Sequence, residues 1–160
     1  MFQADELLLA LREARVRFVV IGGIAVGVHG YVRATKDLDI VPDPEPENLT
    51  RLSWLLRELD AQHVGVGDFA AEEFPYDPTD PEQLAQGGNF RLETHLGPLD
   101  IMQWVAGIDD DPVYAALAHD AITVQFRGGE LLVCGIDHLR AMKQAAGREQ
   151  DLQDLRELGA

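Results

Sequence analysis

Cysteine is nearly absent from the sequence, with Cys134 the single one in 160 residues. One thiol excludes an internal disulfide framework and is typical of a reducing compartment, so we expect a cytoplasmic protein. Long apolar runs are also missing, and none approaches the roughly 18 residues of a membrane span. The first residues include Asp5 and Glu6 where a signal peptide would carry basic residues. We therefore expect neither a membrane span nor a secretion signal.

Positive charge is scarce as well. Thirteen basic residues stand against 28 acidic ones, which gives a formal net charge of −15. A field of this sign repels phosphate backbones. The sequence therefore predicts that nucleic acid binds only with help from local or metal-borne positive charge.

What is present indicates an ordinary globular protein. Hydrophobic residues make up 46% and charged residues 26% of the chain, and the length predicts a single domain over residues 1–160. Apolar residues at helical spacing predict helices at 4–15, 24–30 and 46–60. A continuous apolar run at 18–21 predicts a strand covered on both faces, and alternation at 37–41 predicts a strand that Pro42 ends.

The second half of the chain predicts two hairpins and a helical tail. Strands are expected at 89–96 and 99–104 around a turn at Gly97-Pro98, and at 121–126 and 130–134 around Gly128-Gly129. The tail, about 136–160, has one helix capped by Asp137 and a second opened by Arg148, which carries Leu152, Leu155 and Leu158. The expected fold class is mixed α/β (α+β), a β-sheet flanked by helices with a short C-terminal helical tail.

One segment has no clear pattern. Residues 67–88 interleave acidic residues with prolines, and we expect a long irregular loop. Loops of this length in compact domains are often lids or mobile segments. The role of this acidic loop cannot be assigned from the pattern.

Two Asp-x-Asp pairs occur, and their positions distinguish them. Asp109 and Asp111 lie in an acidic stretch next to Gly and Pro, which predicts a solvated turn. Asp37 and Asp39 instead share one face of an apolar strand, where two carboxylates repel and desolvate each other. A cation between them would relieve that repulsion, and oxygen ligands of this kind suit Mg²⁺.

A glycine pair precedes these acids. Gly22 and Gly23 join the predicted strand at 18–21 to a helix, and such a turn lets backbone N–H groups approach a phosphate closely. Gly-Gly turns are also common in purely structural roles, so the pair gains force only in combination with the acids.

The combination resembles a known signature. FVVIGGIA at 18–25 and RATKDLDIV at 33–41 are similar to the signature of the DNA polymerase β-like nucleotidyltransferase superfamily, and most like small bacterial AbiEii-type toxins. That signature is an apolar strand, Gly-Gly or Gly-Ser, a short helix and Asp-x-Asp on the next strand. Its later carboxylate is matched by LDIM at 99–102. Its C-terminal lysine, arginine and two aspartates are matched by LRAMK at 139–143 and REQDLQD at 148–154.

The resemblance implies a nucleotidyltransferase fold and a role for each matched residue. Asp37, Asp39 and Asp100 would hold Mg²⁺ (or Mn²⁺). Lys143 would be a phosphate ligand or the base. The nucleotide-binding set would be Gly22, Gly23, Arg33, Thr35 and Lys143. For Arg33 we favour pairing with the triphosphate over compensation of the acids. For Arg148, Asp151 and Asp154 we give equal weight to two interpretations: a surface or inter-helix row of salt bridges, and a role in the site.

Two departures from the family pattern are visible. Gly23 stands where many relatives have Ser, so a hydroxyl contact to phosphate is missing, and the chain is shorter than full AbiEii-type toxins. The remaining candidates have plainer interpretations. Trp54 predicts packing rather than stacking on a base, and Cys134 predicts a buried small hydrophobe. Trp104 ends the strand of Asp100 and could line the pocket, but core packing is favoured. The histidines show no metal-ligand spacing: His29, His63, His95, His119 and His138.

The function expected from the sequence is Mg²⁺-dependent transfer of a nucleoside monophosphate from an NTP to an acceptor. The acceptor is a tRNA, a protein or a small molecule, and the toxin resemblance implies a cognate antitoxin as partner. The alternative is a non-catalytic nucleotide-binding or protein-interaction module of the same fold. The joint presence of three carboxylates and Lys143 favours the enzyme.

Overall fold

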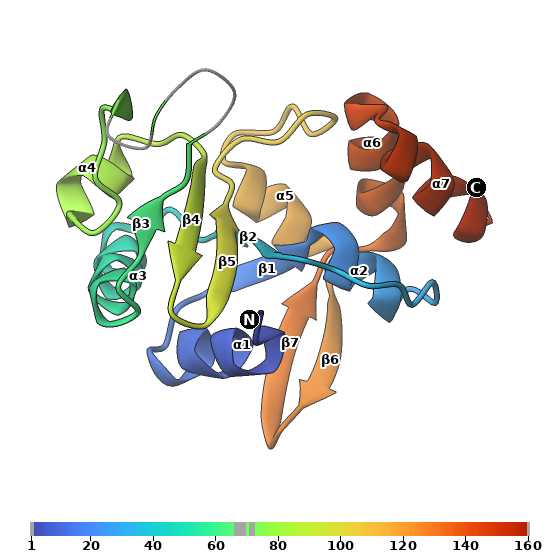
Figure 1. The fold of residues 1–160 in the computed structure, drawn as a ribbon. Coiled ribbons are helices and arrows are strands. Elements are labelled where there is room, and N and C mark those ends of the chain that lie inside the picture. Colours follow the sequence, from blue (N-terminus) through green and yellow to red (C-terminus); the bar gives the residue numbers. More distant parts are fainter. Residues whose placement is uncertain (1, 66–69, 71–72, 160) are drawn as a thin grey trace.

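The structure is a computed structural model that describes residues 2–65, 70 and 73–159. Its helices are α1 (Ala4–Glu13), α2 (Gly22–Val28), α3 (Pro46–Glu58), α4 (Pro81–Ala85), α5 (Val113–His119), α6 (Ile136–Ala146) and α7 (Glu149–Glu157). Its strands are β1 (Phe18–Ile21), β2 (Leu38–Pro42), β3 (Gln62–His63), β4 (Phe90–Thr94), β5 (Gly97–Ile101), β6 (Ile122–Phe126) and β7 (Gly129–Val133) (Figure 1). Among these residues no helix is both long and apolar enough to cross a membrane.

The strands form one mixed seven-stranded sheet in the order β3-β4-β5-β2-β1-β7-β6. β1 lies next to the centre and all four of its residues are buried, as its continuous apolar run predicts. It pairs antiparallel with β2 and parallel with β7, while β2 pairs parallel with β5. The hairpins β4–β5 and β6–β7 extend the sheet on either side. This is the mixed α/β (α+β) class expected from the sequence.

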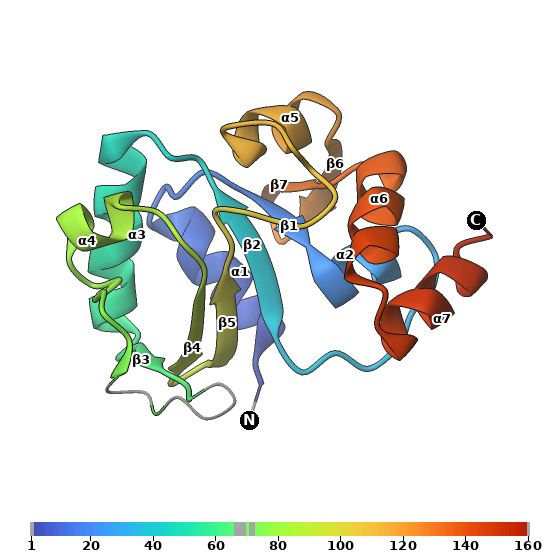
Figure 2. The same ribbon diagram turned by 90° about the horizontal axis from the view of Figure 1, so that it is seen from above.

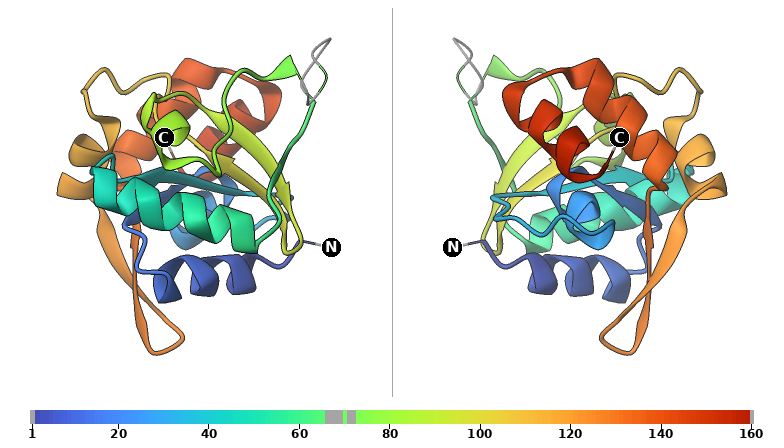
Figure 3. Two further views of the ribbon diagram at one scale, coloured as in Figure 1. Left: turned by 90° about the vertical axis from the view of Figure 1, so that its left-hand side faces the viewer. Right: turned by 90° about the vertical axis from the view of Figure 1, so that its right-hand side faces the viewer.

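Helices cover the sheet (Figures 1 and 2). α1 packs against α3, and α6 packs against α7 and α2. The two views in Figure 3 show α1 on one side of the sheet and α6 and α7 on the other. Leu7, Leu11, Leu52 and Leu56 are fully buried with the strand residues in one core. Apolar residues at three- and four-residue spacing thus place α1 and α3 on the sheet.

Several element boundaries differ from the sequence expectation. α2 begins at Gly22 rather than residue 24, and Pro42 is the last residue of β2 rather than its terminator. The first hairpin turns at His95–Leu96, and Gly97 and Pro98 begin β5. Thr94 causes the earlier turn, because its hydroxyl donates to the Gly97 carbonyl at 2.8 Å and accepts the Leu96 N–H at 3.1 Å.

The second hairpin and the tail show comparable corrections. The β6–β7 turn lies at Arg127–Gly128, and α6 has Gly135 as its N-cap, with Asp137 in its first turn. On α7 the buried residues are Asp151 and Asp154, whereas Leu152 is 45% exposed. The face of α7 that packs inward is therefore an acidic one, which the leucine spacing did not predict.

Three elements were not expected at all. α4 lies inside the predicted acidic loop at 67–88, where Pro81 occupies the first turn and the Asp80 carboxylate accepts the Glu82 N–H at 3.0 Å. The short strand β3 and helix α5 were also missed. Asp68 and Glu72 of the acidic loop lie outside the described residues.

Candidate active site

Three carboxylates meet at the centre of the sheet. Asp37 immediately precedes β2, Asp39 lies within β2, and Asp100 lies opposite Asp39 in the parallel register of β2 and β5. One carboxylate oxygen of each lies within 4.8 Å of the other two. Because β2 and β5 are adjacent, residues 61 and 63 positions apart in sequence form one cluster, which we call the acid triad.

The acid triad concentrates negative charge in a poorly solvated place. Burial, followed by the charges of Asp37 and Asp100, raises the pKa of Asp39 to about 8. Burial also raises the pKa of Asp100, against the opposing charge of Arg91, whose Nε lies 3.6 Å from Asp100 Oδ2. Among the described residues, Asp100 Oδ1 is buried without a hydrogen-bond partner. A buried, unpartnered oxygen among mutually repelling carboxylates fits a hard divalent cation.

Gly22 makes this arrangement possible. Its φ is +73°, and a Cβ on it would stand 2.0 Å from Asp39 Oδ2. At Gly23 a Cβ would stand 2.5 Å from Thr35 Cγ2 and 3.2 Å from a guanidinium nitrogen of Arg33. The glycine pair therefore lets the start of α2 touch both the acid triad and the 33–35 segment, so that three of the sequence-predicted residues, Asp39, Thr35 and Arg33, lie around it.

A second charged cluster faces the acid triad from α6 and α7. Lys143 Nζ lies 2.9 Å from Asp154 and 3.2 Å from Asp151. Arg33 grips both oxygens of Asp154 at 2.8 and 2.9 Å, and Arg148 contacts Asp151 at 2.7 Å. We call these five residues the cation cluster, because three positive groups share two carboxylates. Arg148, Asp151 and Asp154 thus make salt-bridge contacts, as one of their two interpretations predicted. Arg33, which was expected to pair with the triphosphate, pairs with Asp154 in this structure.

The two acids of the cation cluster are held ionised. Burial opposes ionisation of Asp154, but hydrogen bonds from Arg33, Lys143 and Gln150 bring its pKa down to about 2. Burial likewise opposes ionisation of Asp151, and hydrogen bonds from Arg148 and Lys143 lower its pKa below the usual value. Nearby Asp151, then Asp39 and Asp37, raise the pKa of Arg148. Arg148 therefore lies within electrostatic reach of the acid triad.

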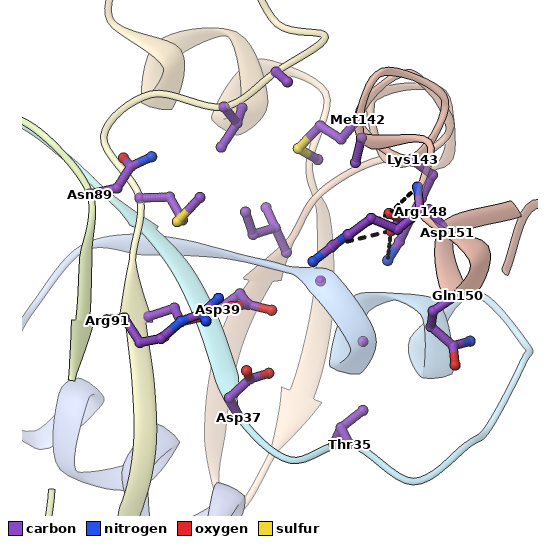
Figure 4. Close-up of a pocket in the computed structure, with 18 of the residues that line it drawn as sticks. Thr35, Asp37, Asp39, Asn89, Arg91, Met142, Lys143, Arg148, Gln150 and Asp151 are labelled. Atoms are coloured by element: carbon purple, nitrogen blue, oxygen red, sulfur yellow. Dashed lines mark hydrogen bonds and ion pairs between the residues drawn. The ribbon is translucent and has the colours of Figure 1, made fainter. Parts of the chain in front are cut away.

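One cleft of about 750 Å³ joins both clusters. Figure 4 shows Asp37 and Asp39 between Asn89 and Arg91 on the β4 side and Lys143 and Arg148 on the α6–α7 side. Sequence reasoning missed several lining residues, which belong to no motif and lie before α4, on or beside the β4–β5 hairpin, and on α6: Phe74, Asn89, Phe90, Arg91, Met102, Val105 and Met142.

The aromatic and sulfur-containing residues divide into correct and incorrect expectations. For Trp104 core packing was favoured over lining the pocket, but the residue is 64% exposed and lines the cleft. Trp54 was also expected to pack, yet it is 56% exposed on α3. Cys134 is fully buried as predicted, and burial raises the pKa of its thiol to about 12.

The histidines contact the backbone or a neighbouring carboxylate. His29 bonds to the Cys134 carbonyl at 2.7 Å, and His95 bonds to that of Leu59 at 3.1 Å. Within the described part of the chain, the acid triad is the group whose carboxylate atoms could hold a metal ion. Asp109 and Asp111, the other Asp-x-Asp pair, are exposed outside any helix or strand.

Comparison with known proteins gives similarity of fold. No family model and no curated protein matches the sequence. The lincosamide antibiotic adenylyltransferase LnuA, solved with lincomycin bound, superposes with a TM-score of 0.61 at 14% identity, over 97% of this chain and 93% of that one. TM1012 of Thermotoga maritima, named as a nucleotidyltransferase, gives 0.55 at 16% identity over 98% and 94%.

A third similar structure is an antigenic nucleotidyltransferase-like protein of Paracoccidioides brasiliensis. Its TM-score is 0.54 at 19% identity, over 98% of this chain and 75% of that one. None of these three is an AbiEii-type toxin, so that finer resemblance stays a prediction. The seven-stranded mixed sheet, its flanking helices and the C-terminal helical tail agree with these neighbours, and the chain has the nucleotidyltransferase fold.

Proposed function

We propose that this protein binds an NTP with Mg²⁺ or Mn²⁺ and transfers the nucleoside monophosphate to an acceptor hydroxyl. The observation that carries the proposal is the acid triad, with the buried and unpartnered Asp100 Oδ1, facing the cation cluster across one cleft. A triphosphate needs cations along its length, and a carboxylate site needs a cation of its own. The cleft holds both kinds of group side by side: the positive side chains of the cation cluster for the phosphates, and the carboxylates of the acid triad for a metal ion.

The acid triad would hold the metal ion. When bound, the ion would neutralise charge on the reacting phosphate and on the leaving pyrophosphate. Asp39 and Asp100 lie opposite each other on adjacent strands, so their backbone spacing is fixed by the sheet. Gly22 lets Asp39 approach the start of α2 closely, and Gly23 lets Thr35 and Arg33 do the same. The phosphate oxygens would lie beside these residues.

The cation cluster would receive the β- and γ-phosphates. Lys143 is 7% exposed and donates to two carboxylates, so we assign it as a cationic phosphate ligand rather than the base. The Arg148 side chain is 73% exposed and is therefore able to turn from Asp151 toward an incoming phosphate. In the reaction the acceptor oxygen forms a bond to the α-phosphorus, the bond from that phosphorus to the pyrophosphate oxygen breaks, and the hydroxyl proton leaves to solvent.

Acceptor and setting belong to the same proposal. LnuA is an adenylyltransferase of lincosamide antibiotics, which makes a small acceptor one precedent on this fold. The AbiEii resemblance of the sequence suggests a toxin–antitoxin setting with a cognate antitoxin, and the single buried cysteine suits a cytoplasmic location. The alternative, a non-catalytic nucleotide-binding module, predicts nucleotide binding without any transfer.

A labelling experiment tests the proposal. The protein is incubated with Mg²⁺, desalted cell extract plus its small-molecule fraction, and each NTP labelled at either the α- or the γ-phosphate. Nucleotidyl transfer places α-label, and no γ-label, on a new product, and Asp100→Asn abolishes it while Asp109→Asn does not. Transfer of γ-label, or equal labelling by Asp100→Asn, would contradict the proposal. Binding with no product at all would establish the non-catalytic module instead.

A further inference from the structure

The acid triad divides the cleft into two unlike halves. One half holds the cation cluster. The other, formed by β4, the segment after β5 and one residue of the segment before α4, is lined mainly by apolar and aromatic side chains: Phe74, Phe90, Met102, Trp104 and Val105. Figure 4 places Asn89 and Arg91 of this second half across the Asp residues from Lys143 and Arg148. Arg91 and the triad's own Asp100 are the charged residues among the described lining of the apolar half.

The geometry of nucleotidyl transfer assigns the pyrophosphate and the acceptor to different halves of the cleft. In nucleotidyl transfer the attacking and leaving oxygens lie roughly in line through the phosphorus. If the cation cluster receives the pyrophosphate, as proposed above, the acceptor hydroxyl must approach from the opposite side of the acid triad. That side is the apolar half.

Trp104 is the most exposed large apolar residue there, and its backbone is fixed. The Asn89 carboxamide accepts the N–H of Gln103 at 2.9 Å and that of Trp104 at 3.1 Å, and it donates to the Trp104 carbonyl at 3.0 Å. Gln103 in turn donates to the carbonyls of Leu84 and Gly88 at 3.1 and 3.2 Å. An indole that is 64% exposed on so constrained a backbone is a preformed platform for a flat or apolar surface.

Size and charge narrow the ligand further. The whole cleft, about 750 Å³, lies in the range of small-molecule sites, roughly 300–1,000 Å³. The chain carries a net charge of −15, so its field disfavours a polyanionic acceptor such as RNA. The apolar lining likewise offers little to the phosphates of a nucleic acid.

We propose that the apolar half of the cleft binds a small, non-anionic acceptor that carries its reactive hydroxyl beside an apolar or aromatic ring face, which rests on Trp104. This inference depends on the proposed nucleotidyl transfer and adds its acceptor class. The acceptor oxygen bonds to the α-phosphorus and pyrophosphate leaves toward the cation cluster.

The test separates acceptor size from catalysis. Cell extract is divided by ultrafiltration into a small-molecule filtrate and a macromolecular retentate, and each is incubated with protein, Mg²⁺ and the four α-labelled NTPs. We expect label on filtrate compounds that a reversed-phase resin retains more strongly than NTP. Label confined to retentate RNA or protein would overturn the acceptor class and leave nucleotidyl transfer standing. Label in neither fraction would overturn both proposals.

The chain offers a matched pair of variants. Trp104→Ala should slow labelling about tenfold at subsaturating filtrate, which corresponds to about 1.4 kcal/mol of lost binding. Trp54→Ala removes an equally exposed indole from α3, outside the cleft, and should leave labelling unchanged. Both variants should keep the parent's thermal shift with Mg²⁺ and NTP. If Trp104→Ala labels the filtrate compounds as fast as the parent, the proposed contact between Trp104 and the acceptor is wrong. If the variant loses the thermal shift with Mg²⁺ and NTP, Trp104 contacts the nucleobase instead.

Discussion

Asp39 is a largely buried carboxyl group surrounded by like charges. Burial and the charges of Asp37 and Asp100 raise its pKa to about 8, so its ionised form is disfavoured in the folded state. Asp39→Asn removes one charge from this cluster and keeps the shape of the side chain. In EDTA at pH 8 we therefore expect the variant to unfold at a denaturant concentration at least as high as the parent's. Isothermal titration should show weaker Mg²⁺ binding, and equal titrations for both proteins would refute the metal assignment.

The same carboxyl gives the metal-free protein a pH dependence. Its pKa is about 8 when folded and 3.8 in its reference state, so between these values the folded protein binds more protons than the unfolded chain. The free energy of unfolding in EDTA should therefore fall as pH rises from 6 to about 8.5. The raised pKa of Asp100 acts in the same direction. Urea denaturation across this range should show a shallower slope for Asp39→Asn, and parallel slopes would contradict the assignment.

Asp154 makes the opposite contribution. It is fully buried and holds both Lys143 and Arg33, so Asp154→Ala would leave Arg33 without its carboxylate and Lys143 with Asp151 alone. Breaking a buried ion pair from one side typically costs about 3–5 kcal/mol. Denaturation at pH 7 should show a loss of that size, whereas exposed Asp109→Ala should stay within about 0.5 kcal/mol. A loss below about 1 kcal/mol for Asp154→Ala would contradict the assignment of Asp154 as a buried ion-pair partner of Lys143 and Arg33.

At the residue scale, the sequence indicated the acidic and basic residues of the cleft but did not identify its apolar half. Asp37 and Asp39 stand out because two carboxylates on one face of an apolar strand need a reason. Trp104 and Arg91 carry no such signal, since their place depends on the β4–β5 hairpin and on the Asn89 side chain that fixes the backbone of Trp104. Contacts between segments distant in sequence have no local pattern to reveal them.

Helix α2 provides a comparison between two of its own glycines. Gly22→Ala would combine a φ of +73° with a Cβ 2.0 Å from Asp39 Oδ2, whereas a Cβ on Gly27 would meet nothing within 4 Å. We expect Gly22→Ala to lower both stability and Mg²⁺ affinity, because Asp39 must move. Gly27→Ala should instead gain about 0.5–1 kcal/mol from its helical position. Thermal denaturation and Mg²⁺ titration of the two variants decide the matter, and equal behaviour would contradict the role given to Gly22.

At the scale of elements, continuous and regularly spaced apolar patterns were sufficient. They predicted β1, β2, α1, α3 and the β4–β5 hairpin, because each of these buries an apolar face. The β6–β7 hairpin was also predicted, although none of the residues of β6 is buried. Short elements failed: α5 buries only Val113 and Leu117, and β3 has two residues. The buried face of α7 was misread, since Asp151 and Asp154 are buried by ion pairs with Lys143, Arg33 and Arg148 rather than by apolar packing.

At the scale of the molecule, we expect the charge of −15 and the two clusters to make nucleotide binding conditional on metal. NTP and the acid triad repel each other, so the cation cluster alone should hold NTP weakly in EDTA. Mg²⁺ without NTP should relieve only the repulsion among the carboxylates of the acid triad. The two ligands should therefore stabilise the protein together by more than the sum of their separate effects.

The most direct test of the central claim, that the acid triad and the cation cluster form one metal–nucleotide site, is the thermal unfolding midpoint with Mg²⁺ and NTP together. A ligand at a hundredfold excess over its Kd stabilises by about 2.7 kcal/mol, which for this size is a rise of roughly 5–11 °C. We expect that rise with at least one NTP, a smaller one for Lys143→Ala and Asp100→Asn, and the full rise for Asp109→Asn. No rise with any NTP in Mg²⁺ or Mn²⁺, or its loss in Asp109→Asn but not in Asp100→Asn, would contradict the account.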